Sequence, residues 1–111
     1  MKFNIKKEEL KKIPAVNADH IIYLNIAAAN NKVKFSVFGK NISEIEIEVD
    51  ANVSEEGFGI IVYNNFNNVA EVFNDGIDIE CEFKDEHFNM SAKNIDISIK
   101  GYENIPESFL Q

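Results

Sequence analysis

The chain has 111 residues, 45% of them hydrophobic, which fits one folded domain and argues against a disordered protein. Its formal net charge is −8, from 19 acidic residues against 11 basic ones, all of them lysine. No apolar run approaches the about 20 residues that cross a bilayer, and the start MKFNIKKEEL lacks the hydrophobic core of a secretion signal. The single cysteine, Cys81, cannot form an internal disulfide, so we expect a cytoplasmic protein with no membrane contact.

The charge is unevenly distributed along the chain. Residues 1–12 hold five lysines and two glutamates, a balance of +3, while the rest holds six lysines against seventeen acids, a balance of −11. One interpretation is a solvated basic turn on an acidic protein. The other is a protein that repels polyanions over most of its surface and accepts them on one face.

Alternation of apolar and polar residues predicts strands throughout the chain. The expected strands lie around residues 3–5 and at 20–29, 33–37, 42–50, 58–63, 77–83, 87–91 and 95–99. Short segments rich in Asn, Asp, Gly and Lys separate them, and such residues tolerate the left-handed backbone of tight turns.

Two segments follow a helical period instead. Residues 6–13, KKEELKKI, place Leu10 and Ile13 on one side among lysines, and Pro14 limits this short helix. Residues 64–74, NNFNNVAEVFN, carry apolar side chains at i, i+3, i+4 and i+7 and are followed by Asp75-Gly76, a helix-stop signal.

A repeated phrase indicates an internal duplication. FSVFGKNI at 35–42 resembles FNMSAKNI at 88–95, so that Phe35 matches Phe88 and Ile42 matches Ile95. The order strand, helix, three strands then occurs twice. We therefore predict an α+β fold of two βαβββ units, about 1–52 and 57–101, related by a pseudo-twofold axis, with both helices on one face of antiparallel sheets. Residues 102–111 are expected to form a C-terminal tail or linker.

Three segments carry a family resemblance. The start MKFNIKKEEL, the stretch NKVKFSVFGKNISEIEIEV and the end IKGYENIPESF together resemble the N-terminal domain of the bacterial DNA polymerase III β subunit, the sliding clamp. The resemblance covers nearly the whole chain. It departs from the family in its second helix, which carries no lysine or arginine, and in its length, because a clamp ring needs six such domains.

The resemblance implies a non-enzymatic processivity factor that tethers replication proteins to duplex DNA without reading its sequence. Its helices would line the ring, which makes Lys6, Lys7, Lys11 and Lys12 the candidate DNA-binding residues. The alternative is that these lysines only solubilise a short helix, with Glu8 and Lys12 as an i,i+4 pair. The expected protein partners are a DNA polymerase or a clamp loader.

Ring closure would need strand pairing between neighbouring copies. By resemblance, the self-association edges are the fourth strands of the two halves, marked by Glu44, Glu46, Glu48, Asn94, Asp96 and Ser98. The same acidic row is alternatively a guard against such pairing. The rival class is therefore a clamp-like interaction module that binds polymerase, clamp or clamp loader without encircling DNA, and the chain is equally consistent with a fragment of a multi-domain clamp.

We find no motif for catalysis, cofactor binding or metal binding. His20 and His87 follow acids at strand starts, where a bare strand-edge histidine is the simplest interpretation. Cys81 alternates with core residues and is expected to be buried. Phe38, together with Phe58 and Tyr63, could line a peptide groove, with core packing as the alternative.

Overall fold

A computed structural model describes residues 1–14, 16, 20–40 and 42–104, so most of the tail expected at 102–111 lies outside the described residues. The elements are β1 (Lys2–Lys6), α1 (Lys7–Leu10), β2 (Ile22–Ala29), β3 (Lys32–Gly39), β4 (Ile45–Asp50), β5 (Asn52–Glu55), β6 (Gly57–Val62), α2 (Tyr63–Ala70), β7 (Asp78–Lys84), β8 (His87–Ala92) and β9 (Ile95–Tyr102). None of the helices in these ranges is long and apolar enough to span a membrane.

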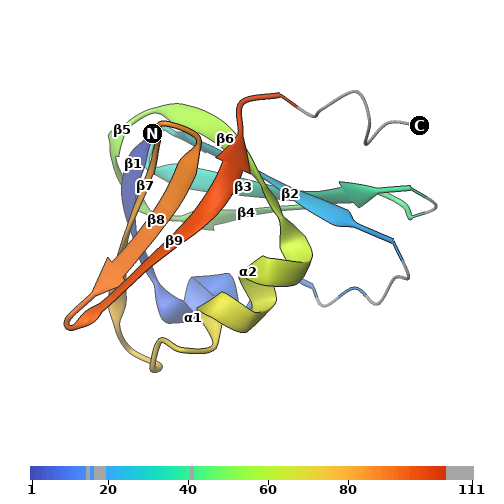
Figure 1. The fold of residues 1–111 in the computed structure, drawn as a ribbon. Helices are drawn as coiled ribbons and strands as arrows, with labels where there is room; N and C mark the ends of the chain where they lie inside the picture. Colours follow the sequence, from blue (N-terminus) through green and yellow to red (C-terminus); the bar gives the residue numbers. More distant parts are fainter. Residues whose placement is uncertain (15, 17–19, 41, 105–111) are drawn as a thin grey trace.

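All strand pairs are antiparallel, and the strands follow the order β4-β3-β2-β6-β9-β8-β7-β1-β5. The two end strands, β4 and β5, are joined in sequence through Ala51 alone. Because the ends of the order are covalent neighbours, the sheet wraps around on itself (Figure 1). Its inner face carries the alternating apolar residues, including Phe3, Ile26 and Phe35, each at most 1% exposed.

The two helices lie side by side on one side of the strands (Figure 1). Leu10 and Ile13 from the first helical segment, and Phe66 and Phe73 from the second, are buried in the core. The helices begin directly where β1 and β6 end, so each is held at the end of the strand that precedes it. The expectation of two helices on one face of antiparallel sheets therefore agrees with the structure.

Both helices are shorter than their sequence patterns predicted. α1 covers four residues of the expected 6–13, and α2 ends at Ala70, with turn residues up to the buried Phe73. The strand β5 was not anticipated, because NVSE shows little apolar alternation. It forms through pairing with β1, where Phe3 lies opposite Val53.

The pairing pattern repeats between the two halves. The first strand of each half pairs with the strand that follows the helix of the other half: β1 pairs with β7, and β6 pairs with β2. The first strands also pair with the last strand of their own half: β1 pairs with β5, and β6 pairs with the end of β9. Matching two-residue turns with positive φ, Asn30-Asn31 and Asp85-Glu86, connect β2 to β3 and β7 to β8. Counted from these turns, Phe88 corresponds to Val33 and not to Phe35. Counted from the other ends of these strands, where β3 ends at Gly39 and β8 ends at Ala92, the residues match as the repeated phrase aligned them.

Candidate functional site

The lysines of the first helical segment do not form a uniform basic surface. Lys7 is only 6% exposed, and its ammonium donates a hydrogen bond to the carbonyl oxygen of Ala70 at the end of α2. This contact joins the two helices and neutralises carbonyl charge at a helix C-terminus. Lys7 is thus placed inside the fold, where a phosphate group cannot reach its ammonium.

The remaining candidate lysines are exposed, and two of them have acidic partners. Lys11 Nζ lies 2.5 Å from Asp75, and Lys12 Nζ lies 2.7 Å from Glu9. The hydrogen bond from Lys11 holds the pKa of Asp75 below its ordinary value. Lys6 is exposed at the end of β1, directly opposite Asp78 of β7.

The charge on this side of the molecule is balanced or slightly acidic. We call it the helix face; its exposed or half-buried charged residues are Lys6, Lys11, Lys12, Glu8, Glu9, Glu71 and Asp75. α2 has neither acids in its first turn nor basic residues in its last. A duplex with one negative charge per about 1.7 Å of its axis would find no excess of accessible cations here.

Two strand segments have a side that pairs with no other strand in the described part of the chain, and they form the second surface. β4 pairs only with β3, and residues 95–100 of β9 pair only with β8, because β9 meets β6 only at Gly101 and Tyr102. These are the segments expected to be edges. Of the six residues named for self-association, Glu46 and Glu48 lie on β4 and Asp96 and Ser98 on β9, all exposed; Glu44 and Asn94 directly precede the strands.

Lysines of β3 partly neutralise the acidic row on β4. Lys34 Nζ lies 3.4 Å from Glu46, and Lys32 Nζ lies 3.0 Å from Asp50. The latter hydrogen bond lowers the pKa of Asp50 and raises that of Lys32. Such exposed pairs stabilise the fold little, since solvent screens them.

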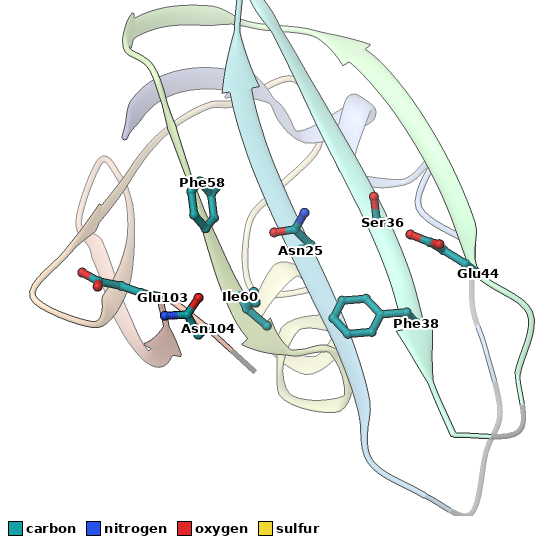
Figure 2. Close-up of a pocket in the computed structure, with 8 residues that line it drawn as sticks. All are labelled: Asn25, Ser36, Phe38, Glu44, Phe58, Ile60, Glu103 and Asn104. Atoms are coloured by element: carbon teal, nitrogen blue, oxygen red, sulfur yellow. The ribbon is translucent and has the colours of Figure 1, made fainter. Parts of the chain in front are cut away.

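The third surface is a groove of about 610 Å³ on the outer face of β2, β3 and β6. We call it the outer groove. Its lining residues are Asn25, Ser36, Phe38, Glu44, Phe58, Ile60, Glu103 and Asn104. Figure 2 shows the aromatic rings of Phe38 and Phe58 on separate strands with Ile60 between them, and the carboxylates of Glu44 and Glu103 at opposite ends. Phe58 is 58% exposed, which is unusual for a large apolar side chain.

The sequence anticipated this groove only in part. Phe38 and Phe58 line it as suggested, whereas Tyr63 is buried in the core and donates a hydrogen bond from its hydroxyl to the carbonyl of Pro14. The remaining lining residues were missed as groove residues. The available signal was the period of FGIIVY, which places Phe58 and Ile60 on the face opposite Gly59 and Ile61.

The titratable groups considered from the sequence do not assemble into a reactive site. His20 and His87 are both exposed, and His87 Nδ1 lies 2.9 Å from the carbonyl oxygen of Asp85. Cys81 is 1% exposed, and burial raises the pKa of its thiol. Within the described part of the chain, no three His, Cys, Asp or Glu side chains are grouped as metal ligands would be.

Comparison with solved structures identifies the fold as that of one domain of a bacterial sliding clamp. The Caulobacter crescentus β sliding clamp matches with a TM-score of 0.78 and 17% sequence identity, over 96% of this chain and 31% of the clamp chain. The Helicobacter pylori β clamp bound to a DNA ligase peptide matches with a TM-score of 0.76 and 14% identity, over 96% of this chain and 33% of that one.

No protein-family model and no curated protein sequence matches the chain. The chain spans about a third of the length of the clamps that it resembles. At this level of identity the similarity defines the fold alone, and the sequences differ at most positions.

Proposed function

We propose that this chain is a non-enzymatic, clamp-like protein-interaction module of the DNA replication machinery. It would dock to a polymerase, a sliding clamp or a clamp loader without encircling DNA. The observation that carries the proposal is the charge of the helix face: Lys7 is buried, and two of the three accessible lysines, Lys11 and Lys12, are paired with neighbouring acids. The free strand edges and the outer groove supply surfaces for protein partners.

The Helicobacter pylori clamp, which has the same domain fold, binds a DNA ligase peptide. Protein docking is thus compatible with this fold. In the present chain the outer groove has the features of a peptide site, namely an apolar floor and a few polar groups at its ends. A non-encircling module needs these surfaces but does not need a basic helix face.

The proposal is tested with the purified full chain and purified bacterial replication proteins. We expect biolayer interferometry to detect micromolar or tighter binding to a sliding clamp, its loader or its polymerase, and light scattering to give the mass of a monomer. A fluorescent duplex of about 30 base pairs at low salt should bind far more weakly, because the helix face has no excess of cations. A hexameric mass with strong duplex binding would contradict the module.

The second candidate is a DNA-tethering sliding clamp assembled from several copies of the chain. The two free edges favour it, because the edge at Glu44, Glu46 and Glu48 of one copy would meet the edge at Asn94, Asp96 and Ser98 of the next. Such a head-to-tail contact closes into a ring when the rotation permits. Lys6, Lys11 and Lys12 would then be the residues nearest the DNA, with Lys7 holding the helices together.

Light scattering of edge variants tests this candidate. If a ring exists, Glu46→Arg with Glu48→Arg should change its mass, whereas Glu71→Arg on the helix side should leave the mass unchanged. An unaltered hexamer in the double variant would contradict assembly through β4.

We further propose that the two halves, 1–52 and 57–101, arose by duplication of one βαβββ unit. The equivalent pairings of β1 with β7 and of β6 with β2 support this proposal. The replication role would place the protein in the cytoplasm. Superposing the halves on the turn-based register tests the duplication.

A further inference from the structure

The outer face of the strands differs between the two halves. On β6 the outward residues Phe58 and Ile60 lie opposite Ala27 and Asn25 of β2. At the corresponding places of the other half, Lys2 and Asn4 of β1 lie opposite Glu82 and Glu80 of β7. On their outer faces, one half therefore carries charged and amide side chains where the other carries three apolar side chains and one amide, Asn25.

This difference gives the outer groove its apolar floor. Phe58 remains 58% exposed and Phe38 is half-buried, while the amide of Asn25 lies on the strand between them and Ser36 lies beside Glu44 (Figure 2). The fold does not require apolar side chains at these positions, because Lys2, Asn4, Glu80 and Glu82 occupy the corresponding places of the other half. Phe58 and the half-buried Phe38 therefore form an apolar surface that another molecule can cover.

The charges around the groove specify what that molecule should carry. Glu44 and Glu103 stand at its two ends, both exposed, and no lysine lines it. Among the described residues, neither carboxylate has an ion-pair partner. An extended peptide with cationic side chains on both sides of an apolar one would match this arrangement.

Two other occupants fit the charge less well. A second copy of this chain carries the same acidic rim and a net charge of −8, so approach of two copies is disfavoured at low salt. The residues that follow Asn104 have the sequence IPESFLQ, which adds Glu107 and contains no lysine. Neither supplies the cations that the two carboxylates favour.

We propose that the outer groove binds an extended peptide segment of a partner protein in which bulky apolar side chains are flanked on both sides by lysine or arginine. This inference rests on the proposed protein-binding function and specifies the chemistry of its partner. Phe38, Phe58 and Ile60 contact the apolar side chains. Glu44 and Glu103 bind the flanking cations, and the half-buried Asn25 supplies hydrogen-bonding groups for the peptide backbone.

Three fluorescent peptides of about ten residues test the proposal by anisotropy with the full chain. The first carries Phe-Leu flanked by two lysines on each side, the second has glutamates in place of the lysines, and the third has alanines in place of Phe-Leu. At low salt the first should bind at least about 10-fold more tightly than either of the others, and its advantage over the second should shrink as salt screens the carboxylates.

Variants locate the effect. Glu44→Gln with Glu103→Gln should reduce the preference for lysine flanks to about 2-fold or less, because both rim charges are removed. The matched control, Glu71→Gln with Glu55→Gln, removes two exposed acids that do not line the outer groove and should preserve the preference. Phe58→Ser should weaken the first peptide about 10-fold without altering the preference, since it removes only apolar contact. Circular dichroism checks that each variant folds.

Several outcomes overturn the inference. Equal affinity for lysine and glutamate flanks, or an equal loss in the control variant, would show that the rim carboxylates do not select the partner. Stronger peptide binding after Phe109→Ser with Leu110→Ser would assign the groove to the chain's own end. A dimer that Phe58→Ser dissociates would assign it to a second copy.

The same experiment separates this inference from the proposed function. If the peptides fail to bind while the chain still binds a clamp, loader or polymerase, only the chemistry assigned to the groove is wrong. If neither the peptides nor the replication proteins bind, the proposed function fails as well.

Discussion

The side chain of Lys7 joins the two helices, and its charge should contribute to stability. Lys7→Met keeps most of the buried aliphatic stem but removes the charged donor to the carbonyl oxygen of Ala70. A hydrogen bond to a charged group contributes about 1.5–3 kcal/mol, so we expect the free energy of unfolding to fall by about that amount. Urea unfolding followed by circular dichroism measures the change.

Lys11→Met is the matched control, because Lys11 is an exposed lysine in an ion pair with Asp75. Exposed pairs contribute between 0 and about 1 kcal/mol, so this variant should remain close to the wild type. Equal destabilisation by the two substitutions would show that the contact of Lys7 with α2 has no special role.

At the level of single elements, two glycines depend on one aromatic ring. A Cβ atom at Gly101 of β9 would lie 2.3 Å from Cε2 of Phe83, and one at Gly59 of β6 would lie 2.6 Å from Cδ2 of the same ring. The ring of Phe83 therefore packs directly on the backbone of both strands where β6 and β9 pair. Both glycines are required by this close approach.

Gly101→Ala should lower the free energy of unfolding by about 1–3 kcal/mol, the usual cost of forcing extra volume into a packed site. In a Phe83→Ala background the same substitution should cost clearly less, because the obstructing ring is absent. The remaining cost would come from the carbonyl oxygen of Ile60, 3.2 Å from the added Cβ. A double-mutant cycle by urea unfolding measures the difference, and additivity within about 0.5 kcal/mol would contradict the packing argument.

The turn between β7 and β8 contains a strained residue. Glu86 has φ = 58°, a left-handed conformation that asparagine and glycine adopt more readily. Glu86→Asn should raise the free energy of unfolding by about 0.5 kcal/mol, after the loss of the exposed ion pair with Lys100. Thermal unfolding measures the change. The control Glu71→Asn, at φ = −68°, relieves no such strain and should give no gain in stability.

The sequence predicted an element well where a local pattern of apolar residues defines it, and poorly where pairing with a distant strand defines it. The alternation of β2, β3 and β7 and the helical stripe around Phe66 were sufficient to place those elements. β5 could not be predicted, because its polar NVSE sequence becomes a strand only through contact with β1. The outer groove was only partly predictable for the same reason: its lining residues come from three strands and from Glu103 and Asn104, which a linear pattern does not bring together.

For the whole molecule, the balance of charges limits any binding to DNA. Lys6, Lys11 and Lys12 are the accessible lysines of the first helical segment, because Lys7 is buried. Neutralising three phosphates gives a slope of about −2.7 in a plot of log affinity against log salt concentration. Any duplex binding by one copy should therefore weaken about 40-fold between about 50 and 200 mM salt.

Anisotropy with two unrelated duplexes at several salt concentrations measures this slope and its independence of sequence. Replacing Lys6, Lys11 and Lys12 with glutamine should bring the slope close to zero, whereas a folded Lys7→Met variant should leave it unchanged. The sequence alone predicted four contacts and hence a slope of about −3.6. That steeper value in the wild type, or a flatter one in Lys7→Met, would mean that Lys7 leaves Ala70 to reach the phosphates, and the helix face would then be more basic than its folded contacts imply.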